Sequence, residues 1–94
     1  MPLETRVDGN TIHITGYVSV DAFEPLKKAL SQVQGDFTLA FDAASFINST
    51  GLAVLMDLLL PLKDSGTITL AHPKAHFRRV FEITGMAKDF VVAG

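Results

Sequence analysis

The chain has 94 residues, which suits one compact domain over residues 1–94 and is too short for two. It is 48% hydrophobic and 19% charged, a composition far from that of disordered chains. The absence of cysteine excludes a disulfide framework, a thiolate zinc site and a cysteine nucleophile, and it fits a reducing compartment. The formal net charge is −2 and the basic residues are scattered, so nucleic-acid binding is not expected.

The sequence indicates a cytoplasmic protein that does not insert into a membrane. Residues 1–7 contain Glu4 and Arg6 and lack the apolar run of a signal peptide. The most apolar stretch, residues 52–62, is interrupted by Asp57 and is too short to span a bilayer.

The first elements predicted are two short strands joined as a hairpin. Leu3–Val7 and Thr11–Thr15 flank the turn Asp8-Gly9-Asn10, whose residues tolerate positive φ angles. Ile12 and Ile14 alternate with polar residues, as in a strand with one buried face. Gly16 is expected to break this second strand.

A helix and a buried strand are predicted next. The helix should run from about Val20 to Val33, with Ser19 as its N-cap, because apolar residues recur at helical spacing. Pro25 is tolerable only in a first turn. The apolar run Phe37–Phe41 suits a strand that is buried on both faces.

The second half of the chain predicts a loop over Asp42–Asn48 and then a helix from about Thr50, with Ser49 at its N-cap. A strand over Ile68–Ala71, a helix over Lys74–Thr84 and a last short strand over Phe90–Val92 follow. Strands that alternate with helices predict an α/β fold: a mainly parallel, mixed sheet with an N-terminal hairpin edge and helices packed on one face.

Two segments carry a resemblance to a known family. Residues 41–52, FDAASFINSTGL, resemble the signature of STAS domains, in which a buried strand ends in Asp and a polar triplet followed by Gly-Leu opens a helix. His72-Pro73, followed by RRVFEITGM over residues 78–86, resembles the family's second block. The spacing of the two blocks also fits, so essentially the whole chain resembles a STAS domain and is similar to the bacterial anti-sigma factor antagonists.

The resemblance implies a function and a set of partners. Such antagonists are switches without enzymatic activity or cofactor, and they bind a serine kinase that doubles as an anti-sigma factor and itself holds the ATP. The kinase phosphorylates the serine of the polar triplet, the phosphoprotein is released, and a phosphatase resets the switch. Carried over by position, the acceptor is Ser49, with Thr50 as the runner-up.

The chain departs from the family at three places. Asn48 and Ser19 stand where the family usually has Asp, and the chain reaches Gly94 without the further C-terminal helix that is common among members. The residues alone also allow a simpler role for Ser49, that of an N-cap worth about 1 kcal/mol. A phosphate would nonetheless be well hosted at a helix N-terminus, where N–H groups are free and the helix dipole is positive.

The helix after Ser49 is unusually apolar, and its spacing places Leu52, Leu55, Leu59 and Leu62 in a core stripe. Leu60 falls outside this stripe, either as an isolated surface leucine or as part of a docking edge. Pro61 should bend or end the helix near Leu60. The expected partner-binding surface comprises Ser19, Asn48, Ser49, Thr50, Gly51, Ala53, Met56 and Leu60.

Other sites are not indicated. His13, His72 and His76 do not share a metal-ligand spacing, and no serine has matching His and Asp partners. Phe77, Val80, Phe81 and Ile83 are expected in or near the core, and Arg78 and Arg79 on a solvated face, with an acidic partner as the alternative. An alternative function is a STAS subunit docked constitutively in a larger assembly, such as a lipid-transport ABC complex or a stressosome-like particle. A small enzyme or ligand-binding domain is the third possibility.

Overall fold

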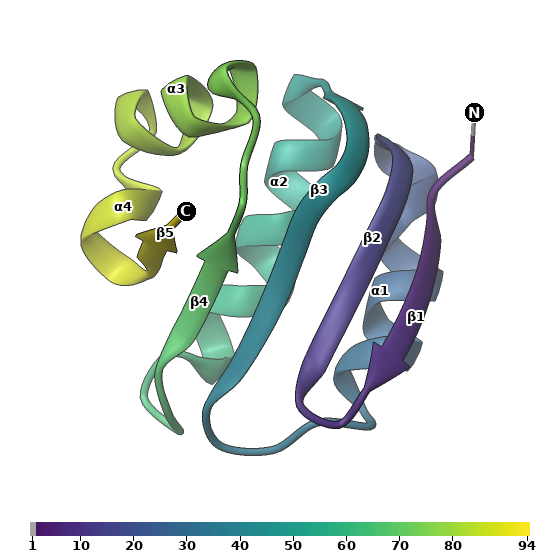
Figure 1. The fold of residues 1–94 in the computed structure, drawn as a ribbon, viewed down its shortest axis with the longest axis vertical. Coiled ribbons are helices and arrows are strands. Elements are labelled where there is room, and N and C mark those ends of the chain that lie inside the picture. The colour runs from purple at the N-terminus through teal and green to yellow at the C-terminus, as the bar shows by residue number, and fades with distance from the viewer. Residues whose placement is uncertain (1) are drawn as a thin grey trace.

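The structure, a computed structural model that describes residues 2–94, is built on a five-stranded sheet with the strand order β1-β2-β3-β4-β5 (Figure 1). β1 (Glu4–Asp8) and β2 (Thr11–Val18) form an antiparallel hairpin. β3 (Phe37–Ile47), β4 (Ile68–Ala71) and β5 (Val91–Ala93) add to it in parallel. The predicted mixed sheet with a hairpin edge is therefore confirmed.

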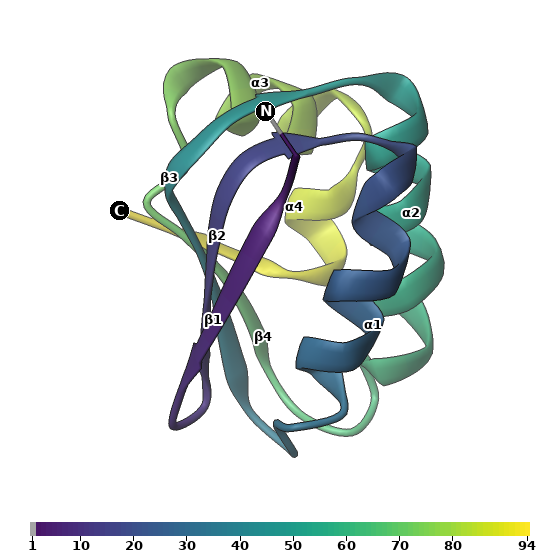
Figure 2. The same cartoon turned by 90° about the vertical axis from the view of Figure 1, so that its right-hand side faces the viewer.

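The helices cover one face of this sheet and its upper end. Figure 2 shows α1, α2 and α4 on the same side of the strands, while α3 lies across the top, where the parallel strands end. The helical segments are η1 (Val20–Ala22), α1 (Phe23–Leu30), α2 (Ser49–Leu59), η2 (Leu60–Leu62), α3 (Ala75–Ile83) and α4 (Met86–Asp89). The predicted packing of helices on one face is confirmed.

The core lies between the sheet and the helices. Alternate residues of the strands, such as Ile12 and Ile14 of β2, are fully buried on the helix side. Three phenylalanines fix α3 to the sheet: the rings of Phe77 and Phe81 lie 5.5 and 5.4 Å, centroid to centroid, from that of Phe41. These contacts hold α3 beside the start of α2.

Two strands are longer than the sequence indicated. β2 continues to Val18 because Gly16, with φ of 90°, is accommodated inside the strand next to a register shift between Gly16 and Tyr17. β3 continues to Ile47, so the loop expected over Asp42–Asn48 is wrong. Its second half is too rich in small and polar residues to show the pattern of a buried strand, yet it pairs with β2 through Val18 and Ile47.

The helices also differ from expectation in places. The first predicted helix is divided into η1 and α1, which puts Pro25 into the first turn of α1, where its missing N–H is tolerated. Ser19 precedes η1 but makes no side-chain capping bond. α4 was not predicted, and Ile83, expected near the core, is 72% exposed.

Candidate functional site: the start of helix α2

The residue that caps α2 is Asn48. Its backbone is extended, its side-chain oxygen accepts a 2.7 Å hydrogen bond from the N–H of Gly51, and its carbonyl accepts one of 2.9 Å from Leu52. The expectation that Ser49 is the N-cap is therefore wrong. The physical reason is that α2 begins directly after β3, so the one extended residue between Ile47 and the helix is Asn48, and asparagine is among the best capping residues.

Ser49 is the first residue of α2 and is exposed, as are its neighbours Asn48 and Thr50. Within residues 2–94 its hydroxyl forms no hydrogen bond, and the N–H groups of Ser49 and Thr50 donate to no protein atom. The hydroxyl of Ser49 therefore lies at the positive end of the helix dipole, next to two free N–H groups, and is itself unused. This arrangement suits a negatively charged group attached to Ser49.

Gly51 allows the end of β2 to approach the first turn of α2 closely, because glycine has no side chain. A β-carbon at this buried position would overlap the carbonyl of Val18 and lie 2.8 Å from the backbone nitrogen of Ser19. The N–H of Asn48 also donates to the carbonyl of Val18, at 3.2 Å. The half-buried Ser19 is thereby held beside the start of α2, and Gly51 acts as a packing residue with little surface to offer a partner.

The remaining residues of the expected partner surface lie further along α2. Ala53 is exposed one turn after Ser49, and Met56 is half-buried and packs against the core. Leu60 is half-buried and packs against the core, so its expected place off the core is wrong. α2 ends at Leu59, close to where Pro61 predicted an end or a bend, and the chain continues in η2.

An aromatic row that the sequence did not reveal lies beside this site. The ring of Phe46 is 5.5 Å from that of Tyr17 and is stacked on His76 at 5.4 Å, centroid to centroid. Tyr17 and Phe46 are 46% and 43% exposed. One signal was available: in an extended chain, neighbours such as Phe46 and Ile47 point to opposite faces, so one of the two must leave the core.

A small pocket opens between the start of α2 and α3. Its volume is about 250 Å³, and it is lined by Ile47, Asn48, Ser49, Leu52, Val80, Ile83 and Thr84. Ser49 thus belongs to the wall of an apolar pocket as well as to a helix N-terminus. Sequence reasoning missed this pocket, because it depends on how α3 is placed and not on any local pattern.

The described residues give no sign of two other kinds of site. Among residues 2–94, no group of three or more His, Asp or Glu side chains is placed to hold a metal ion. No helix in this part of the chain has both the length and the apolarity needed to cross a bilayer.

The family follows from a comparison over nearly the whole chain. A family model described as "Mlab, STAS domain" matches residues 3–93. This chain belongs to the STAS domain family. The match confirms the resemblance read from the segment around Ser49 and the block after His72. No curated protein sequence matches this STAS domain.

Solved structures place the same fold among anti-sigma factor antagonists. An antagonist from Mycobacterium paratuberculosis has a TM-score of 0.74 and 19% identity, with 97% of this chain and 83% of that chain covered. Bacillus SpoIIAA in its phosphorylated form has a TM-score of 0.66 and 22% identity, with 98% and 91% covered. A putative antagonist from Thermotoga maritima has a TM-score of 0.75 and 15% identity, with 98% and 86% covered. At these identities the likeness is one of fold.

Proposed function

We propose that this STAS domain is an anti-sigma factor antagonist: a cytoplasmic, non-enzymatic interaction module that binds a serine kinase acting as an anti-sigma factor and is switched by phosphorylation of Ser49. The observation that carries the proposal is the exposed, unused hydroxyl of Ser49 at the first position of α2. The fold it shares with Bacillus SpoIIAA, a protein solved in a phosphorylated form, supports this role. The partner would hold the ATP, and a phosphatase would reset the switch.

The proposed switch acts through surface charge. A phosphoserine adds about 1.5 to 2 negative charges at neutral pH. Because Ser49 is exposed and the cap is made by Asn48, the phosphate needs no change in the core and no loss of the capping bond. The folded domain would therefore keep its structure while the surface it presents to a partner changes.

A second function has one observation in its favour. The matching family model is described by the name Mlab and not as an antagonist. A STAS subunit that docks constitutively in a larger assembly would use the same exposed start of α2 without modification. In that case Thr50 and Ser49 would be contact residues and not phosphate acceptors.

Phosphate mapping separates the two functions. The domain is incubated with ATP and each anti-sigma-type serine kinase encoded in the same genome, and the product is analysed by mass spectrometry. We expect phosphate on Ser49, its loss in Ser49→Ala, and normal labelling of Ser45→Ala, which alters another exposed serine. Phosphate on Thr50 would move the switch by one residue. A lack of phosphate, together with co-purification of an ABC ATPase, would favour the constitutive subunit.

A further inference from the structure

We infer that the pocket beside Ser49 receives one apolar side chain of the partner protein, and that Arg79, one turn before the lining residue Ile83, pairs with an acidic residue near that side chain. The inference deepens the proposed function, since it concerns the partner of the same site.

The wall of the pocket suits an apolar group. None of the described residues that line it is charged, and its apolar lining residues are Ile47, Leu52, Val80 and Ile83. Two polar atoms of the lining residues are engaged: the hydroxyl of Thr84 donates to the carbonyl of Val80 at 2.8 Å, and the Asn48 oxygen is held by the cap, which leaves the hydroxyl of Ser49 as the free one. A polar ligand would therefore find few partners there.

The size of the pocket favours a single side chain over a small molecule. Its volume of about 250 Å³ lies below the range of roughly 300 to 1,000 Å³ that is typical of ligand sites. Ile83 lines the pocket with 72% of its surface exposed, so its apolar surface is continuous with the apolar wall. Covering Ile83 while filling the pocket would remove apolar surface from water, as an anchor residue at a protein interface does.

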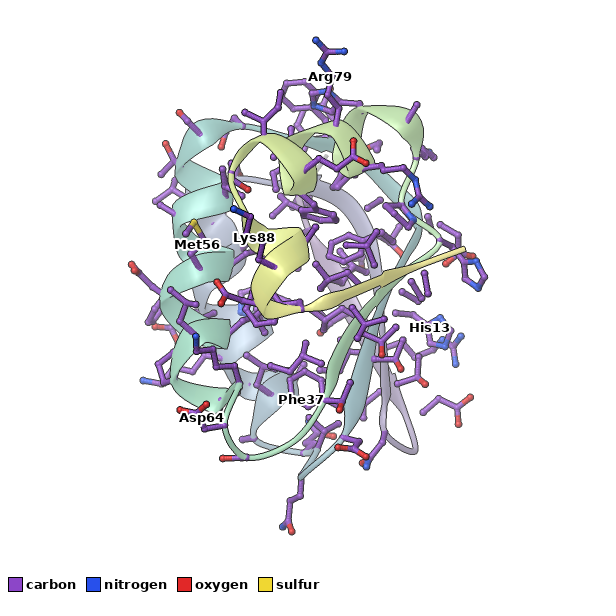
Figure 3. The ribbon with its side chains drawn as sticks, turned by 90° about the vertical axis from the view of Figure 1, so that its left-hand side faces the viewer. His13, Phe37, Met56, Asp64, Arg79 and Lys88 are labelled. Carbon is purple, nitrogen blue, oxygen red and sulfur yellow. The ribbon has the colours of Figure 1, made fainter. Side chains whose placement is uncertain are left out.

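Arg79 supplies a charge that the protein leaves unused. It precedes Ile83 by one turn of α3, so the two side chains are neighbours on the helix surface. Figure 3 shows its side chain pointing away from the body of the protein. In the range 2–94 it takes part in no ion pair, even with Glu82, and in no hydrogen bond.

Two other cations near the C-terminal part of the fold are occupied, whereas Lys74 and Lys88, like Arg79, have no ion-pair partner in the described part of the chain. Arg78 donates to the carbonyl of Gly94, and Lys63 forms a 3.1 Å ion pair with Asp89. Arg79 differs from Lys74 and Lys88 in its position, one turn before Ile83 on α3 and next to Val80 of the pocket wall. An apolar pocket with a free guanidinium one helical turn from its lining residue Ile83 is complementary to a segment that carries an apolar residue and a carboxylate. This charge complementarity identifies the occupant as a partner segment of that composition.

The same geometry explains how phosphorylation would release the partner. Ser49 lines the pocket, so a phosphate on its hydroxyl would place negative charge and bound water at the mouth. This charge would repel the partner's carboxylate and compete with it for Arg79. Binding would weaken although the core and the cap of α2 are unchanged.

A phage-displayed library of random peptides, selected on the immobilised domain, tests the inference without knowledge of the natural partner. We expect the enriched peptides to share an aliphatic or aromatic residue close to Asp or Glu. The best peptide, made synthetically, should bind Arg79→Glu at least about fivefold more weakly and Ile83→Ala about tenfold more weakly. Lys28→Glu, the same charge reversal at an exposed site on α1, should bind it normally.

Each other outcome has a clear meaning. The inference is overturned if no peptide is enriched, if the enriched peptides carry basic residues, or if Arg79→Glu and Ile83→Ala bind the peptide like the wild type while melting normally. Phosphate mapping at Ser49 tests the proposed function separately. If the kinase phosphorylates Ser49 but the domain selects no preferred peptide, the proposed function stands and this docking mode is wrong.

Discussion

The side-chain oxygen of Asn48 accepts a 2.7 Å hydrogen bond from the N–H of Gly51, and this bond leaves the neighbouring Ser49 without a part in capping α2. Asn48 thus stabilises the helix, while the adjacent Ser49 carries the proposed switch. A change at Ser49 can alter the surface without altering the helix, which is what a reversible modification requires.

The first prediction separates these two residues by stability. Asn48→Ala should lower the free energy of unfolding by about 0.5–2 kcal/mol, because the N–H of Gly51 loses its acceptor. For a domain of this size, each 1 kcal/mol corresponds to a melting temperature lower by about 4–8 °C. Ser49→Ala should leave the melting temperature nearly unchanged, contrary to what a capping serine would give. Asn48→Asp is the control, since aspartate also caps. Thermal unfolding of the three variants tests which residue caps α2. Equal losses of stability for Asn48→Ala and Ser49→Ala would contradict the assignment of the cap to Asn48.

The second prediction concerns Gly51. Gly51→Ala should destabilise the domain by about 1–3 kcal/mol, because its methyl group would overlap the carbonyl of Val18 and force β2 away from α2. Thr50→Ala, an exposed change in the same turn, is the control. Denaturant unfolding gives the stability, and amide exchange at Ser19 should report the displacement. A Gly51→Ala protein as stable as wild type, with an unaltered Ser19, would show that the contact between the two segments is loose.

The sequence predicted the sheet and its helices well because local patterns report them. The strand Ile68–Ala71 was predicted at the bounds the structure gives, since a short apolar run between turn residues has few alternatives. The hairpin turn was marked by Gly9, whose φ is 60°. The second half of β3 was missed because pairing with β2, and not its own composition, makes it a strand.

The candidate site was predicted in part. The segment from Asn48 to Thr50 was located correctly at the start of a helix, because the polar triplet and the apolar run after it are contiguous. The cap was assigned to the wrong residue, since a shift of one position leaves the local pattern unchanged. The pocket and the stacking of Phe46 on His76 join segments far apart in sequence, so only the folded structure shows them.

The third prediction distinguishes core from surface along α2. Leu60→Glu should destabilise the domain, because a half-buried leucine that packs against the core would be replaced by a charge. Ala53→Glu introduces the same side chain at an exposed position one turn from Ser49, so it should leave the melting temperature unchanged but weaken binding of the partner. Melting curves and affinity for the partner are measured for both. If Leu60→Glu is as stable as the wild type, Leu60 is a surface residue and does not pack against the core.

The last prediction tests Ser49 itself. Ser49→Asp should fold normally, since a carboxylate suits the positive end of α2, yet it should lose binding to the partner because a fixed negative charge then lies in the contact surface. Ser49→Ala should keep or tighten binding, because it cannot be phosphorylated, and Asn48 preserves the cap. Affinity and melting temperature are measured for both variants. If Ser49→Asp binds the partner as tightly as the wild type does, the charge at this position is without effect, and Ser49 is not the switch.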